Sequence, residues 1–110
     1  MAGSYIDDVH EVTRLIPAGR VTTYGAIAGF LTLGSARMVG WALRQGLATG
    51  ETVPAHRVVN RLGELSGRNN FPTPTAMRDR LEAEGVRVVD DRVADFAERF
   101  WSPEVLLHHD

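Results

Sequence analysis

Side chains able to carry out covalent or metal-assisted chemistry are scarce in this chain of 110 residues, which has no cysteine. The missing thiol excludes disulfides, cysteine-based zinc sites and thiol catalysis together. The histidines at positions 10, 56, 108 and 109 show no metal-ligand spacing beyond the terminal pair. No glycine-rich phosphate loop is present, and no serine occupies a nucleophile elbow. The sequence therefore predicts no catalytic residue, no metal site and no cofactor.

Arginine supplies all twelve basic residues, and its distribution along the chain is uneven. Between residues 13 and 68, seven arginines stand against two acidic residues, which gives this segment a formal charge of +5. The rest of the chain holds five arginines and twelve acidic residues, a charge of −7, so the net charge is −2. A planar guanidinium suits contacts with phosphates and base edges. We therefore expect a nucleic-acid-binding surface in the middle of the chain.

The elements that must position these arginines are predicted from helical spacing. Residues 5–15 form a first helix, for which Ser4 and Asp7 resemble a capping box. Two shorter helices, residues 24–31 and 36–45, flank a four-residue turn, as in a helix-turn-helix.

The last of these three helices has two distinct faces. Its core face is expected to hold Val39, Ala42 and Leu43, whereas the charged face carries Arg37, Trp41 and Arg44, at positions i, i+4 and i+7. Together with the preceding turn, in which Ser35 is the expected helix cap, this pattern predicts a recognition helix.

The second half of the chain predicts two hairpins and a helix. Strands at residues 58–59 and 64–66 are expected to pair across a turn at residues 60–63 as the wing of a winged helix. Thr73 as cap and Pro74 at the first position start a helix through Glu84, which Gly85 ends. Residues 86–93 read as a tight hairpin, and an aromatic tail (Phe96, Phe100, Trp101) is expected to cover the core.

The predicted fold class is thus α/β, mostly α: a winged helix-turn-helix DNA-binding domain with small β-hairpins. One domain is expected over residues 1–110, since this length suits one modest core. No apolar run approaches the ~20 residues of a membrane helix, and no signal-peptide pattern opens the chain, so a cytoplasmic protein is expected.

Four ordered motifs resemble the DNA-binding domain of the O6-alkylguanine-DNA alkyltransferases. They lie at residues 16–25, 36–40, 54–59 and 81–85, and the resemblance covers about residues 7–84. The third motif reads Pro54-Ala55-His56-Arg57-Val58-Val59, with alanine where the family has the cysteine that accepts the alkyl group. The chain is therefore most similar to the alkyltransferase-like proteins, which lack that cysteine, and Asn60 directly after the motif also fits this branch.

The resemblance implies a role in DNA for several residues. Arg37 matches an arginine finger that enters the duplex from the minor groove and fills the gap left by a flipped base, and Tyr24 matches a tyrosine that presses on the 3′ phosphate. Base flipping costs a few kcal/mol, part of which a guanidinium can offset by bonding the orphaned base. Further DNA contacts are expected from Thr23, Ser35, Trp41 and Arg44.

The resemblance also implies a lesion pocket lined by Tyr24, Ala55, Val58, Ser66 and Arg68. The missing sulfur at Ala55 leaves room for an alkyl group on the guanine oxygen, and Arg68 is expected to lie over the flipped base.

His56 and Glu84 match groups that activate the family thiol. Without that thiol they are expected to form a hydrogen-bonded frame and not to catalyse. Arg57 is expected to tie the motif to the fold.

The sequence departs from the family in three places. Met38 and Trp41 replace small residues of the recognition helix, the asparagine that follows that helix in the family is not evident, and the loop at residues 69–74 has no clear match.

Three functions are compatible with the sequence. The first is a non-enzymatic sensor, expected to be a monomer, that binds O6-alkylguanine in double-stranded DNA and flags it for nucleotide excision repair proteins. The second is an alkyltransferase inactivated by replacement of its cysteine with Ala55. The third is a winged-helix transcription regulator with no preference for damaged DNA, which would bind undamaged sites by sequence.

Overall fold

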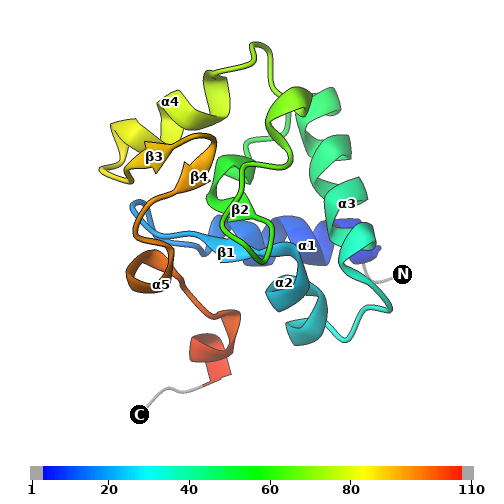
Figure 1. Ribbon diagram of the computed structural model, residues 1–110. Coiled ribbons are helices and arrows are strands. Elements are labelled where there is room, and N and C mark those ends of the chain that lie inside the picture. The colour runs from blue at the N-terminus through cyan, green and yellow to red at the C-terminus, as the bar shows by residue number, and fades with distance from the viewer. Residues whose placement is uncertain (1–3, 108–110) are drawn as a thin grey trace.

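The computed structural model describes residues 4–107. Helices and short strands alternate along the chain in a mostly helical α/β arrangement (Figure 1). Its helices and strands are α1 (Tyr5–Arg14), β1 (Thr22–Thr23), α2 (Tyr24–Phe30), α3 (Ala36–Thr49), β2 (Val58–Val59), α4 (Ala76–Ala83), β3 (Val88–Val89), β4 (Arg92–Val93) and α5 (Phe96–Arg99). This is the predicted fold class. No helix among the described residues is long and apolar enough to cross a membrane.

Helix α1 follows its predicted bounds to within one residue and packs against α3. The Ser4 side chain makes no capping hydrogen bond, so the expected capping box does not form. The buried His10 hydrogen-bonds through Nε2 to the carbonyl oxygen of Ala42, at 2.8 Å. Gly46 allows this close approach, because a Cβ there would lie 3.0 Å from that same ring nitrogen. The His10 hydrogen bond and the space left by Gly46 therefore fix the close packing of α1 against α3.

Helices α2 and α3 form the predicted helix-turn-helix. The Thr23 hydroxyl oxygen accepts a hydrogen bond from the backbone N–H of Ala26 at 3.0 Å, which caps α2. The turn closes through the N–H of Leu33, which donates to the carbonyl oxygen of Ala28 at 2.8 Å. Helix α3 runs four residues beyond the predicted end and stops at Gly50, whose φ of 78° is the left-handed conformation that favours glycine.

The predicted wing hairpin is wrong in its pairing. Strand β2 pairs in parallel with β1, Thr22 with Val58 and Thr23 with Val59, and not with residues 64–66. The Asn60 side-chain oxygen accepts hydrogen bonds from the backbone N–H groups of Leu62 and Glu64, and this tightens the turn. The returning segment pairs instead with the C-terminal hairpin: Glu64 forms an antiparallel bridge with Arg92. The pairing partner of a two-residue strand is set by the segment that the packed helices place beside it. Here that segment is β1.

The C-terminal elements largely match their predictions. Strands β3 and β4 form the expected tight hairpin, and both turn residues, Asp90 and Asp91, have positive φ, as a type I′ turn requires. Helix α4 begins at Ala76 and not after Thr73, since the preceding segment turns to bury Phe71. Two residues of the aromatic tail, Phe96 and Trp101, cover the core as expected and are half-buried against it. The prediction is wrong for Phe100, which is 37% exposed and does not pack on the core.

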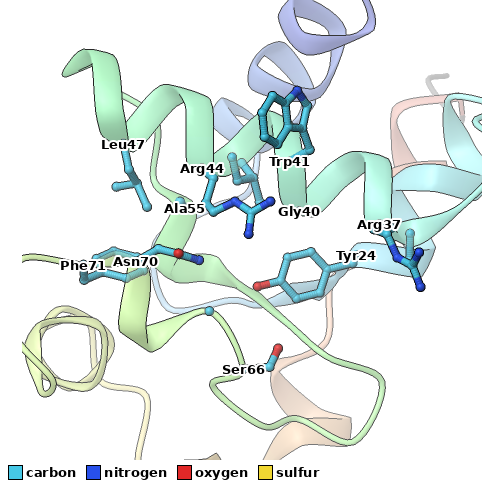
Figure 2. Close-up of a pocket in the computed structure, with 13 residues that line it drawn as sticks. Tyr24, Arg37, Gly40, Trp41, Arg44, Leu47, Ala55, Ser66, Asn70 and Phe71 are labelled. Atoms are coloured by element: carbon cyan, nitrogen blue, oxygen red, sulfur yellow. The ribbon is translucent and has the colours of Figure 1, made fainter.

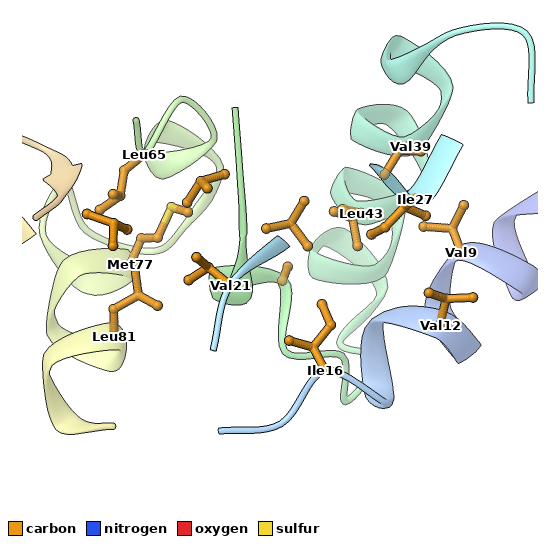
Figure 3. Packing of buried hydrophobic residues seen from close by; sticks show 14 of the residues in the cluster. Val9, Val12, Ile16, Val21, Ile27, Val39, Leu43, Leu65, Met77 and Leu81 are labelled. Carbon is orange, nitrogen blue, oxygen red and sulfur yellow. The ribbon is translucent and has the colours of Figure 1, made fainter. Parts of the chain in front are cut away.

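One cluster of apolar side chains joins these elements (Figure 3). Helices α1, α2 and α3 supply one part of it and the segment around α4 supplies the other, with Val21 and Ile16 lying between them in this view. Members without measurable exposure include Val9, Val21, Ile27, Val39, Ala42, Val58, Val59, Leu65, Met77, Leu81 and Val86. The cluster fixes α3 against the segment that carries Ala55, and these two elements form the walls of the cavity described next.

Candidate functional site

A cavity of about 340 Å³ opens beside α3, between that helix and the segment after β2 (Figure 2). It is lined by Tyr24, Ala36, Arg37, Gly40, Trp41, Leu43, Arg44, Leu47, Ala55, Ser66, Gly67, Asn70 and Phe71. Its volume falls at the lower end of the roughly 300–1,000 Å³ typical of small-molecule sites. The cavity is therefore large enough for a small aromatic ligand.

Three of the five residues predicted for the pocket lie together on its wall. Tyr24 comes from the start of α2, Ala55 from the short 3-10 helix before β2, and Ser66 from the loop after it. Ala55 is buried, with 6% of its surface exposed, and contributes only a methyl group to the lining. The site thus holds no nucleophile at the position where the resemblance places one.

The other two predicted residues, Val58 and Arg68, do not line the cavity. Val58 is fully buried in strand β2, as is Val59, because both faces of this short strand pack into the apolar core. The Arg68 guanidinium donates to the carbonyl oxygen of Leu65 at 2.9 Å and lies 3.5 Å from a carboxylate oxygen of Asp91. Asp91 therefore holds Arg68 on the side of the hairpin, away from the cavity.

Tyr24 is held tightly at the cavity wall. A Cβ on Gly67 would lie 2.7 Å from the Tyr24 hydroxyl, so only glycine allows the ring to sit where it does. Burial raises the pKa of Tyr24, and its interaction with the Ser66 hydroxyl opposes that rise. The phenol is thus neutral at physiological pH and available as a hydrogen-bond donor.

The exposed face of α3 carries three of the six residues predicted to contact DNA, Arg37, Trp41 and Arg44, and all three line the cavity. Arg37 lies at the start of the helix, and Trp41, 46% exposed, follows one turn later. The Arg44 guanidinium stacks on the Trp41 ring at 5.5 Å from its centroid. The predicted core face of α3 is confirmed, since Val39, Ala42 and Leu43 are all buried.

Thr23 and Ser35 stand at the first turns of α2 and α3. Thr23 uses its hydroxyl to cap α2, as described above, whereas Ser35 is exposed and makes no capping hydrogen bond. Free N–H groups at a helix start favour phosphate. The two residues therefore mark the N-termini of the two helices of the helix-turn-helix.

His56 and Glu84 form a buried frame behind the cavity. The Glu84 carboxylate accepts hydrogen bonds from Arg57 at 2.7 and 3.0 Å, and one of its oxygens lies 2.8 Å from His56 Nε2. Arg57 also donates to the carbonyl oxygen of Ile16 at 2.8 Å. These contacts tie the 54–59 motif to α4 and to the end of α1, as expected for Arg57.

The pKa values of this frame favour a structural role. Burial alone would raise the pKa of Glu84, but hydrogen bonds and charges from Arg57 and His56 outweigh it and lower the pKa to about 2. Burial lowers the pKa of His56, against the opposing effect of Glu84. The frame therefore holds a fixed carboxylate beside a neutral imidazole at physiological pH.

Several lining residues were not predicted from the sequence. Leu43 and Leu47 continue the α3 face toward the end of the helix, and helical spacing from Arg44 could have suggested Leu47. Asn70 and Phe71 come from the loop that had no clear match, and a single aromatic in a polar loop was the available signal for Phe71.

Metal-ligating groups do not gather anywhere in residues 4–107. The terminal pair noted in the sequence, positions 108 and 109, lies outside the described residues.

The fold and the site define a helix-turn-helix domain with a cavity beside α3 and no cysteine in that cavity. Residues 4–86 match the family model described as "6-O-methylguanine DNA methyltransferase, DNA binding domain". The chain is 36% identical over 100 residues to alkyltransferase-like protein 1 of Schizosaccharomyces pombe. That alignment covers 86% of this chain and 92% of the S. pombe protein. It is 38% identical over 100 residues to the DNA base-flipping protein of Escherichia coli, over 90% of this chain and 75% of that protein.

A solved structure agrees with these sequence matches. S. pombe Atl1 in complex with damaged DNA containing O6-carboxymethylguanine superimposes with a TM-score of 0.78 at 34% identity, over 90% of this chain and 95% of that one. The protein belongs to the DNA-binding-domain family of 6-O-methylguanine DNA methyltransferase, as an alkyltransferase-like member in which Ala55 replaces the acceptor cysteine.

Proposed function

We propose that this protein is a non-enzymatic sensor of DNA damage. It binds duplex DNA through the face of α3, flips O6-alkylguanine out of the helix, and holds the base in the cavity beside Ala55. No covalent step follows, because the chain contains no cysteine to accept the alkyl group.

The observation that carries this proposal is the cavity itself. About 340 Å³ stays open next to a methyl group, at the position where a transferase would hold its sulfur. A protein that used only the outer face of α3 to read undamaged DNA would gain nothing from such a space. The apolar surroundings of Ala55 also favour an alkylated oxygen, at ~0.8 kcal/mol per buried methylene.

Arg37 and Tyr24 are proposed to drive the flipping step. Arg37 is exposed at the start of α3, within reach of a duplex lying on that face. Its guanidinium would fill the gap left by the base, and the nearby Tyr24 would press on the phosphate and guide the nucleotide inward. Together they would offset part of a flipping cost of a few kcal/mol.

We further propose that the bound complex, a monomer on bent DNA, presents the lesion to nucleotide excision repair in the cytoplasm. The supporting feature is the division of charge along the chain. The basic middle is suited to binding DNA, which leaves the acidic C-terminal third available as a surface for protein partners. Size-exclusion chromatography with light scattering, with and without DNA, tests the monomer. Pull-down of purified repair proteins on lesion-bearing DNA tests the partner.

The central experiment compares affinities for one oligonucleotide duplex that carries either guanine or O6-methylguanine at a single position. Fluorescence anisotropy at fixed salt is the readout, since general binding to phosphates depends strongly on ionic strength. Tighter binding to the methylated duplex is expected. Equal affinities would refute the sensor and favour a plain DNA-binding regulator.

A matched pair of variants tests whether the cavity carries this preference. Gly40→Leu projects a side chain into the cavity from α3, where a Cβ at this position meets no atom within 4 Å. Gly29→Leu makes the same change on α2, at a glycine whose Cβ also meets nothing. For Gly40→Leu, the affinity for the O6-methylguanine duplex is expected to fall toward the affinity for the guanine duplex. For Gly29→Leu, the preference for the methylated duplex is expected to persist.

A further inference from the structure

Arg44 brings a charge with unused hydrogen-bonding capacity to the cavity. Among residues 4–107 its guanidinium forms no ion pair with an acidic side chain. By contrast, Arg57 forms an ion pair with Glu84, and Arg68 forms one with Asp91. Arg44 therefore keeps its donors free for a ligand in the cavity that it lines.

Trp41 holds that guanidinium in place. The two side chains are three residues apart on α3, and the Arg44 Cζ lies 5.5 Å from the centroid of the Trp41 ring. Figure 2 shows the guanidinium between the Trp41 ring and the Tyr24 hydroxyl, whereas the Arg37 side chain stands apart at the other end of the cavity. Stacking on an indole fixes the position of a guanidinium and leaves its N–H groups free at the edge.

The rest of this end of the cavity combines an apolar wall with one amide. Leu43, Leu47, Ala55 and Phe71 supply hydrocarbon surface, and Asn70 supplies a carboxamide (Figure 2). A ligand group that suits this end has a short apolar stem and a terminal acceptor, and a planar carboxylate matches the guanidinium fork best.

We infer that Arg44, positioned by Trp41 and accompanied by Asn70, makes this cavity selective for O6-alkylguanines whose alkyl group ends in a carboxylate. This inference rests on the proposed function and names the class of lesion that the site prefers. The methylene of such a group packs near Ala55, and its carboxylate accepts hydrogen bonds from Arg44 and Asn70. Arg44 thus takes the place over the ligand that the resemblance had assigned to Arg68.

The test uses two lesions of nearly equal size, one negatively charged and one neutral. Duplexes of one sequence carry either O6-carboxymethylguanine or the neutral O6-carbamoylmethylguanine, and the intact protein is titrated against both at the same ionic strength. The wild-type protein is expected to bind the carboxymethyl duplex about tenfold more tightly, as one charge-assisted hydrogen bond at a partly exposed site would give. A ratio of one overturns the inference.

Three variants locate the source of the ratio. Arg44→Gln, which keeps a polar side chain but shortens it and removes the charge, is expected to bring the ratio to about one, and Trp41→Leu to lower it part of the way. Arg61→Gln removes an exposed arginine that does not line the cavity and is expected to keep the ratio. A tenfold ratio that survives in Arg44→Gln overturns the inference, and an unchanged ratio in Trp41→Leu overturns the positioning role of the indole.

The same titrations separate this inference from the proposed function. If O6-methylguanine is preferred over guanine while the two larger lesions bind equally, only the selectivity for a carboxylate fails. If no modified base is preferred over guanine, the sensor itself fails.

Discussion

Replacing Glu84 with glutamine tests whether the frame behind the cavity stabilises the fold without taking part in lesion recognition. Glutamine keeps the shape of the side chain but removes the charge that Arg57 and His56 share. Arg57, with only 17% of its side chain exposed, then loses its counter-charge. We expect the variant to fold less stably and to discriminate between guanine and O6-methylguanine as the wild type does, since Glu84 does not line the cavity.

The size of the loss follows from the pKa of Glu84. A pKa of about 2 in the folded protein, against an ordinary value of 4.5, corresponds to about 3 kcal/mol. Water around the partly exposed carboxylate screens these interactions, so we expect a loss of about 2 kcal/mol at pH 7.

The direction of the pH dependence is fixed by the same values. Because folding depresses the pKa of Glu84, its contribution is fully present above pH 4.5 and disappears as the pH falls toward 2. The difference in unfolding free energy between wild type and Glu84→Gln should therefore shrink to less than half between pH 7 and pH 3.

Urea unfolding followed by circular dichroism at both pH values provides the measurement, since the midpoint and slope give the free energy directly. Glu82→Gln, two residues earlier in the last turn of α4 but with a weak, exposed partner 3.9 Å away, is the control and should change stability little. The reasoning is refuted if Glu84→Gln is as stable as Glu82→Gln, or if its deficit is the same at pH 3 as at pH 7.

Four further predictions concern single residues. His56 should titrate below its ordinary pKa of 6.5, so the wild type should lose stability as the pH falls through 6.5, and NMR titration of the ring checks this. Gly46→Ala should destabilise the fold by about 1–3 kcal/mol, because the new Cβ meets His10 Nε2 at 3.0 Å. Gly40→Ala on the same helix should instead stabilise it by about 0.5–1 kcal/mol, and thermal unfolding of both variants compares them. Arg37→Ala should weaken binding to an O6-methylguanine duplex with no change in stability; unaltered discrimination would show that the finger assignment is wrong.

The helical part of the fold was predictable because its signals are local. Alternation of buried and exposed positions every three to four residues located α1, α2 and α3, and it placed Val39 and Ala42 in the core correctly. The pairing of β2 was not predictable in the same way. Val58 and Val59 are equally suited to a hairpin or to a distant strand, and only the packed helices bring Thr22 and Thr23 alongside them.

The site was predictable where it follows α3 and the 54–59 motif, and not in its loops. Tyr24, Ala55 and Ser66 meet at one cavity as expected. Arg68 does not join them, because its partner Asp91 lies in a hairpin more than twenty residues further along. Asn70 and Phe71 take part through a loop whose path depends on burial of the phenylalanine ring, which no local pattern specifies.

A crystal structure of this protein bound to a duplex with one O6-methylguanine tests the central claim most directly. We predict that the modified base lies outside the helix, beside Ala55, with Arg37 in the space that it left. A modified base still stacked within the duplex, above an empty cavity, would contradict this account.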